Sequence, residues 1–321
     1  MRLTLFALLS FLFAATAANG ASDYPNKPIR FVVPFPPGST LDTVGRIMGQ
    51  KLAERLGQPV VIDNRPGAGG NVGYEFVAKA KPDGYTIVIN SAGLAISPSL
   101  YKKLNFDPIK DLAPISLVAQ IPIMVLVRPS LPVKNLKELV DYAKANPGKL
   151  SFGTGGVGTG PHLAGELFKT LAKIDIVHVP YKGAGPAMMS MIGGEIDMML
   201  IVVPTALPQI QAGKVRALAV LSNERFPSLP NVPTAKEAGI DTWEVAVWYG
   251  VLAPAGTPRD IVDRLSAEWT KIAAMPDTME KMQSAEVEPI SGTPEQFSAF
   301  LKAETVRWAK VIKEANILSI D

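Results

Sequence analysis

Cysteine is absent from this 321-residue chain, and histidine occurs only at His162 and His178. Without cysteine the chain forms no disulfide and no thiolate metal site, and it offers no cysteine for lipid attachment. Two histidines are too few for a histidine-rich metal site. We therefore expect a fold that depends on its apolar core and needs neither a metal nor a cofactor.

Charge is also sparse, since charged residues make up only 19% of the chain and the formal net charge is +3. Basic and acidic residues are interspersed, which gives no basis for binding nucleic acid or a membrane surface. The motifs G-x-S-x-G, H-E-x-x-H and the P-loop are missing. These absences favour a binding protein over an enzyme.

Only the N-terminus carries a long apolar run, over residues 3–15 after Arg2. Small residues follow at Ala17, Ala18, Gly20 and Ala21. A basic start, a short apolar stretch and small residues are typical of a signal peptide, and the run is too short for a comfortable membrane span. We predict a signal peptide over residues 1–20, cleaved near residues 18–21. Export without disulfides indicates a bacterial periplasm.

Strand-like and helix-like patterns alternate through the rest of the chain, which predicts an α/β fold with mostly parallel strands. About 300 mature residues exceed what one core usually holds, so two lobes are expected. Residues 22–123 and 226–321 would form lobe 1, and residues 124–225 would form lobe 2 as an insertion. Two chain crossings between the lobes would make a hinge and a ligand cleft.

Two glycine-bearing turns are the most informative motifs. The first covers Pro34–Asp42 after an apolar strand over residues 29–35, and the second covers Phe152–His162 after a strand over residues 150–153. Each leads into a helical pattern, so unpaired backbone N–H groups and the helix dipole would attract an anion there. Neither turn contains lysine or arginine. The pattern predicts a site that recognises a small carboxylate through backbone geometry.

Several side chains in these turns have two possible roles. The hydroxyl groups could donate to a ligand or cap a helix, and Asp42 either completes a capping box with Ser39 or faces a ligand ammonium group. His162 could donate to a carbonyl or to the ligand, while Tyr181 could form a wall of the cleft. The residues predicted from these motifs to bind ligand are Phe35, Pro37, Gly38, Ser39, Thr40, Asp42, Gly153, Thr154, Gly155, Gly156, Gly158, Thr159, His162 and Tyr181.

Residues 153–158 also match the dinucleotide pattern G-x-G-x-x-G. That fold places an acidic residue at the far end of the next strand. Asp175 has a suitable offset but precedes the strand expected over residues 176–179. A nucleotide-dependent oxidoreductase is therefore the less favoured alternative. A turn required only for packing is the structural alternative.

The ordered segments of the chain resemble the Bug-type solute-binding proteins of tripartite tricarboxylate transporters. The segments that carry the resemblance are Val33–Gly38, Asn64–Gly70, Pro82–Thr86, Gly153–Phe168, His178–Gly183, Val232–Thr234 and Ala253–Pro258. They extend over essentially the whole mature chain.

The resemblance implies a two-lobed type II periplasmic binding fold that closes on an organic carboxylate. The two turns would grip one carboxylate, partly through ordered waters, and Ser91 and Ala92 would line the same cleft. The chain departs from the family pattern at Ser39, where glycine is common, and at Thr154 and Thr159, where serine is common.

We predict a monomer that delivers its ligand to an inner-membrane permease. A carboxylate sensor for a signalling partner is the alternative from another class. The ligand's identity does not transfer, and it could be a di- or tricarboxylate, an aromatic acid or an amino acid.

Overall fold

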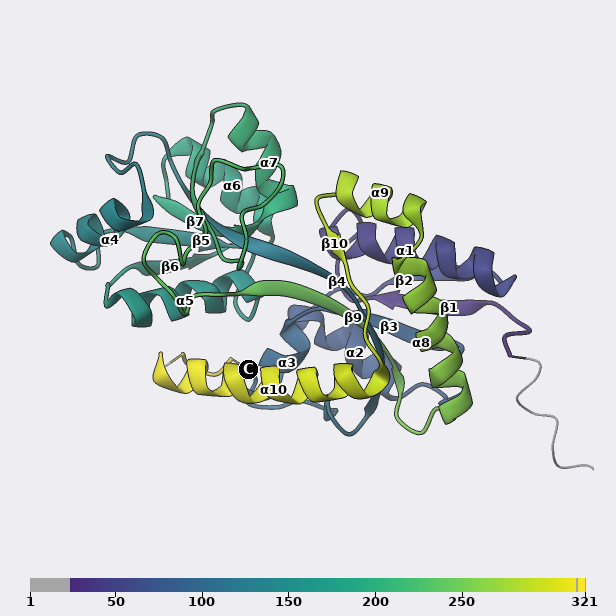
Figure 1. Cartoon of the computed structure of the whole chain (residues 1–321). Helices are drawn as coiled ribbons and strands as arrows, with labels where there is room; N and C mark the ends of the chain where they lie inside the picture. The colour runs from purple at the N-terminus through teal and green to yellow at the C-terminus, as the bar shows by residue number, and fades with distance from the viewer. Residues whose placement is uncertain (1–23, 316, 321) are drawn as a thin grey trace, which may run out of the picture.

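The computed structural model describes residues 24–315 and 317–320, so the predicted signal peptide lies outside the described residues. Figure 1 shows two lobes joined by long strands that run between them. The strands are β1 (Ile29–Val33), β2 (Val60–Asn64), β3 (Thr86–Asn90), β4 (Leu112–Val127), β5 (Ser151–Thr154), β6 (Val177–Pro180), β7 (Met198–Val202), β8 (Arg216–Val220), β9 (Ala246–Pro254) and β10 (Glu288–Pro289). The helices are α1 (Thr40–Leu56), the 3-10 helix η1 (Ala68–Gly70), α2 (Asn71–Ala78), α3 (Gly93–Leu100), α4 (Leu136–Ala145), α5 (Gly160–Ala172), α6 (Ala184–Gly193), α7 (Val203–Gln211), α8 (Arg259–Ala273), α9 (Pro276–Ser284) and α10 (Pro294–Glu314).

Parallel strands set the direction of both predicted glycine turns. β1 pairs in parallel with β2 and with β3, and β5 pairs in parallel with β6 and with β7. The first turn leaves the carboxyl end of β1, and the second leaves the carboxyl end of β5. Ligands of open α/β sheets bind at such carboxyl edges, so the topology places both turns where a site is expected.

The long strand β4 connects the two parts of the sheet. Its residues from Leu112 to Pro122 pair with β9, whereas residues from Ile123 to Val127 pair with β7. Beyond this point the two faces of the strand differ, because Ile123, Val125 and Val127 stay in the main core while Met124 and Leu126 belong to a small separate apolar cluster. The strand therefore changes partners between Pro122 and Ile123.

The lobe boundaries predicted at residues 123/124 and 225/226 stay a proposal. The change of partners along β4 supports the first. Leu229, a few residues beyond the second boundary, still packs in the smaller cluster with Met124. Val245 donates its backbone N–H to the Leu221 carbonyl before the chain enters β9.

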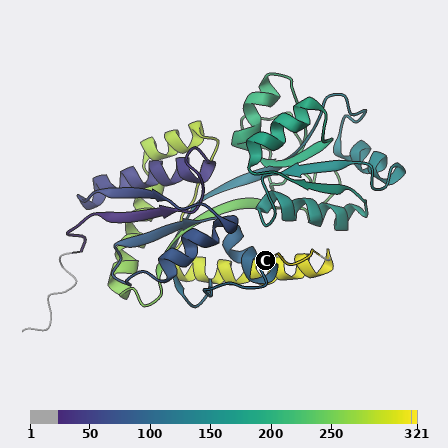
Figure 2. The ribbon, with the colours of Figure 1, turned by 180° about the vertical axis from the view of Figure 1, so that it is seen from behind.

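Helix α10 lies along both lobes. Figures 1 and 2 agree that it starts beside α8 in the first lobe and extends beneath the second lobe toward α5. Glu304, near the middle of the helix, accepts hydrogen bonds from the indole N–H groups of Trp248 in β9 and of Trp308. This buried carboxylate joins the helix to a strand that enters the connection between the lobes.

Three stretches differ from the sequence reading. Helix α3, with Pro98 inside it, and helix α9 with strand β10 were not predicted. The apolar residues 121–127 predict a strand, and β4 extends nine residues before it. The register shifts near Pro114 and Leu117 explain why the early part of β4 lacks a regular strand pattern. Among the residues described, no helix has both the length and the apolar character needed to cross a membrane.

Candidate ligand site at two glycine loops

The first loop is fixed by side chains of helix α1. Ser39 caps the helix, because its hydroxyl accepts the Asp42 N–H at 3.2 Å. Asp42 Oδ2 accepts the backbone N–H of Gly38 at 2.9 Å and the Arg46 Nε–H at 2.9 Å, while Oδ1 accepts from Asn64. The predicted capping pair is present, but the carboxylate reaches Gly38, not the N–H of Ser39.

Asp42 is buried and accepts hydrogen bonds from three protein donors. Burial alone would raise the pKa of this carboxyl, but the hydrogen bonds from Arg46, Asn64 and Gly38 outweigh it and lower the pKa. The carboxylate is therefore ionised at neutral pH and holds the loop. Its oxygens face Gly38, Arg46 and Asn64, so the alternative in which Asp42 meets a ligand ammonium has no support from these contacts.

The second loop is fixed in the same way by helix α5. Thr159 caps the helix and accepts the His162 N–H at 3.4 Å, and its own hydroxyl donates to the Gly156 carbonyl at 2.9 Å. His162 Nδ1 accepts the backbone N–H of Gly158 at 3.3 Å. Because an N–H donates to Nδ1, that nitrogen carries no proton and the proton of neutral His162 lies on Nε2.

Both histidines of the chain support this loop. The rings of His162 and His178 stack with centroids 4.2 Å apart, and His178 Nε2 lies 2.8 Å from the Thr154 hydroxyl. Burial lowers the pKa of His162 to about 3, with His178 and Lys169 adding to the effect. Burial and then Lys169 lower the pKa of His178 to about 4. Both rings are therefore neutral at neutral pH.

Three backbone donors of the second loop remain available. The N–H groups of Gly155, Val157 and Thr159 have no hydrogen-bond partner among the residues that the structure describes. Helix α1 likewise begins at Thr40, whose N–H has no acceptor within its own helix. These donors are the groups that a bound anion could engage.

Strand register places the first loop beside Ser91 and Ala92. Val32 of β1 pairs in parallel with Val88 of β3, so the residues that follow the two strands emerge side by side at the same edge of the sheet. Ser91 is buried, and its N–H donates to the Tyr74 hydroxyl oxygen at 3.1 Å. Ala92 is buried at the start of α3.

The second loop touches this same region. A Cβ on Gly93 would lie 2.9 Å from the Gly69 carbonyl oxygen and 3.9 Å from that of Gly158. A Cβ on Gly158 would lie 2.7 Å from Leu100 Cδ2. The loop after β5 therefore packs against helix α3, which follows β3.

The remaining predicted residues divide by exposure. Pro37 and Gly38 are exposed and Phe35 is half-buried, with its carbonyl accepting from Asn64. Gly153 is buried, and a Cβ there would clash with Ile196 Cδ1 and would lie 3.6 Å from Tyr181 Cε2. Tyr181 packs with the smaller apolar cluster. Its role as a wall of the cleft stays a prediction.

A third glycine turn at residues 67–70 was not included among the predicted site residues. Gly67, Ala68, Gly69 and Gly70 all have positive φ, from +47° at Ala68 to +137° at Gly67. The Gly69 carbonyl lies against Gly93, so this turn borders the region where Ser91 and Gly158 meet. Four glycine or alanine residues in succession before a helix are the signal that could have identified it.

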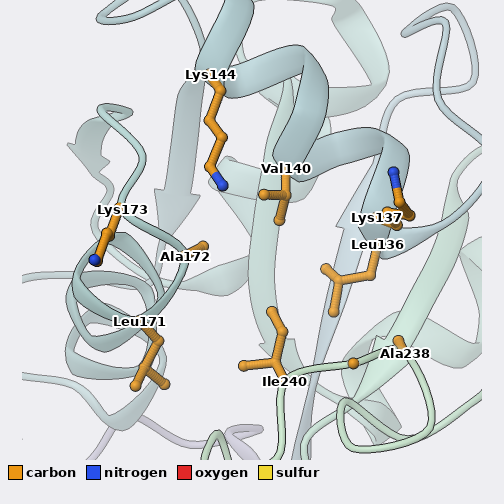
Figure 3. A pocket seen from close by; sticks show the side chains of 10 residues that line it. Leu136, Lys137, Val140, Lys144, Leu171, Ala172, Lys173, Ala238 and Ile240 are labelled. Carbon is orange, nitrogen blue, oxygen red and sulfur yellow. The ribbon is translucent and has the colours of Figure 1, made fainter.

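Two cavities of the described residues lie away from these loops. One, of about 290 Å³, lies between α4, the end of α5 and the turn at residues 238–240; Figure 3 shows the apolar side chains of Leu136, Val140, Leu171 and Ile240 around it. The other, of about 790 Å³, lies beside Pro122 between residues 221–228 and 286–289. Neither is lined by a residue predicted to bind ligand.

Comparison with known proteins identifies the family. Residues 44–317 match the model of the tripartite tricarboxylate transporter family receptor. The chain belongs to this receptor family. It is 35% identical to the protein BugT of Bordetella pertussis over 98% of this chain and 99% of that protein. The predicted resemblance to Bug-type proteins is thus confirmed.

Solved structures of similar proteins confirm the fold. An R. palustris protein solved with adipate is 36% identical, with a TM-score of 0.86 over 93% of this chain and 100% of that chain. The MatC protein of Rhodopseudomonas palustris, solved with malate, is 32% identical, with a TM-score of 0.79 over 90% of this chain and 100% of that chain. This receptor has the expected two-lobed α/β fold of periplasmic binding proteins.

Proposed function

We propose that this receptor works in the periplasm, where it captures a small organic carboxylate and delivers it to a tripartite tricarboxylate-type permease. The observation that carries the proposal is the shared construction of the two loops. Each begins a helix with a hydroxyl cap, fixes its glycine N–H with a side chain, and contains no cationic residue. Relatives solved with adipate and malate support a carboxylate as the ligand.

The proposed mechanism is closure of two lobes about two chain crossings, one near Pro122 and one after residue 225, where the chain returns to lobe 1. The partner change along β4 and the contact of Gly158 with α3 support it. A ligand that touches both lobes favours the closed state in proportion to its extra contacts there. The donors at Gly155, Val157 and Thr159 would be stronger once water is excluded. We further propose that the receptor is a monomer.

A thermal-shift screen against a panel of carboxylates, including adipate and malate, tests the ligand class. Ligand at a hundredfold excess over its Kd should stabilise the receptor by about 2.7 kcal/mol. Neutral diamides of the same length are the matched control and should give no shift. Stabilisation by nucleotides, with none by carboxylates, would contradict the proposal and favour the oxidoreductase alternative.

A transport assay separates uptake from signalling. Deleting the gene for this receptor should abolish uptake of the labelled ligand by cells, whereas loss of a transcriptional response with intact uptake would indicate the sensor alternative.

A further inference from the structure

The two loops have the same local geometry, but the side chain that accepts the glycine N–H differs between them. In the first, the glycine before the cap is Gly38, with φ of +80°, and its N–H is accepted by Asp42. In the second, the glycine is Gly158, with φ of +79°, and its N–H is accepted by His162. Asp42 and His162 occupy the same third position of their helices. One acceptor is an anion and the other is a neutral ring.

The difference in charge matters because the loops are proposed to bind an anion. The negative charge of Asp42 is balanced by Arg46, which bonds the same oxygen. His162 is buried at the second loop, and Lys169, the cation whose charge lowers the pKa of this ring, is already paired with Glu166 at 2.9 Å. A carboxylate in place of His162 would thus add an uncompensated charge to the loop that carries the donors of Gly155 and Val157.

We propose that His162 is a positioning residue that fixes the second loop without adding negative charge, and that stacked His178 holds it in this orientation. The inference rests on the proposed carboxylate binding. His178 extends the same network, because Thr154 accepts the Gly156 N–H at 3.3 Å and lies beside His178 Nε2. The Gly156 carbonyl in turn accepts from the hydroxyls of Thr154 and Thr159. The donors of this loop are therefore set by two rings and two hydroxyls.

The charged groups around the pair are few. The charge of Lys169 on α5 lowers the pKa of both rings, and Glu166 on the same helix forms an ion pair with Lys169. From β5, the Phe152 ring packs on His178 with centroids 4.8 Å apart. An apolar ring on one side and a paired lysine on the other leave both imidazoles without a carboxylate partner among the described residues.

Three substitutions at one position separate acceptor geometry from charge. His162→Asn keeps a neutral acceptor near the place of Nδ1, His162→Asp keeps the acceptor but is anionic, and His162→Leu has no acceptor. Carboxylate affinity is measured by calorimetry with malate or adipate, whichever stabilises the wild-type receptor. We expect His162→Asn to bind at least about tenfold more tightly than either other variant, the scale of one lost hydrogen bond.

Two outcomes would overturn the proposal. Equal affinity of His162→Leu and His162→Asn would remove the positioning role, and equal affinity of His162→Asp and His162→Asn would remove the role of charge. Near-ultraviolet circular dichroism verifies that each variant is folded, and Asn and Asp have nearly the same volume. A folding defect shared by His162→Asn and His162→Asp would thus not produce the expected difference in affinity between these two variants.

A measurement without ligand distinguishes this inference from the proposed function. The chain has only two histidines, so a long-range ¹H–¹⁵N spectrum of the side chains contains two imidazoles, assigned with single variants. We expect His162 to be neutral with its proton on Nε2 from pH 7.5 to 5.5. A proton on Nδ1, or an imidazolium at pH 6.5, overturns the positioning role. If the spectrum is as expected but the receptor binds no carboxylate, the positioning role of His162 is supported and the proposed function is overturned.

Discussion

At the scale of single residues, Asp42 shows how a buried carboxylate organises a loop. It accepts from Gly38, Arg46 and Asn64 and is only 3% exposed. Removing it takes the charged acceptor away from the half-buried Asn64 side chain and from the N–H of Gly38. A hydrogen bond to a charged group stabilises by about 1.5–3 kcal/mol, and less where water can replace the lost partner.

We therefore expect Asp42→Ala to lower the free energy of unfolding by about 1–3 kcal/mol, measured by urea denaturation. Arg46→Ala is the matched control, because Arg46 is half exposed and surface ion pairs contribute about 0–1 kcal/mol. A loss as large in Arg46→Ala as in Asp42→Ala would mean that the ion pair, not the loop contacts, provides the stability.

The residue scale also shows where sequence reasoning succeeds. A hydroxyl followed three positions later by an acid predicts a cap, and Ser39 with Asp42 forms one. The bond from Gly158 to His162 could not be predicted, because it depends on the proton position of a ring and on its burial. The contact between His162 and His178 joins residues from α5 and β6, and no local pattern reports such a pairing.

At the scale of elements, strand β4 and helix α10 link parts of the molecule that lie far apart in sequence. The apolar spacing of residues 294–316 predicts a long amphipathic helix that closes the chain, and the structure has this helix as Pro294–Glu314. Spacing could not predict that Glu304 turns inward to two indoles, since a glutamate in an amphipathic helix usually faces water. The partners Trp248 and Trp308 decide its burial.

We expect Glu304→Ala to lower the free energy of unfolding by about 2–4 kcal/mol, because two buried indole N–H groups lose their acceptor. Glu304→Gln keeps an acceptor oxygen for both indoles and should lose about 1 kcal/mol or less. Chemical denaturation monitored by tryptophan fluorescence measures both variants. Equal losses in the two would show that the charge of Glu304, and not its acceptor oxygen, stabilises the helix.

At the scale of the whole molecule, the histidine pair links stability to pH. Folding lowers the pKa of His162 to about 3 and of His178 to about 4, from 6.5 in the unfolded chain. Between pH 6.5 and 5 the unfolded chain thus binds more protons than the folded receptor. Stability is fully present above pH 6.5 and falls as the pH decreases, by up to about 1.4 kcal/mol per pH unit for each ring.

Urea denaturation at pH 7, 6 and 5 measures this slope. The double variant with His162→Asn and His178→Gln contains no histidine, so its stability should change less over the same range. Carboxylates contribute mainly below this window, since their unfolded pKa values are near 4. An unchanged slope in the double variant would contradict neutral burial of the two rings.

The contact between lobes gives the remaining test at this scale. Gly158 reaches Leu100 of α3 across the proposed cleft, and a Cβ at Gly158 would lie 2.7 Å from Leu100 Cδ2. Gly158→Ala therefore both strains a left-handed backbone and pushes the second loop away from the first lobe. Gly194→Ala is the matched control, because Gly194 has φ of +85° and a Cβ there meets nothing within 4 Å.

Both alanine variants should lose about 1–2 kcal/mol of stability from backbone strain. Only Gly158→Ala should also weaken carboxylate binding, because closure must bring the second loop against α3 for both lobes to share the ligand. Adding Leu100→Ala makes room for the new methyl group and should restore part of the affinity. Calorimetry on all four proteins decides the matter: equal binding by Gly158→Ala and Gly194→Ala would mean that the contact with Leu100 has no part in capture.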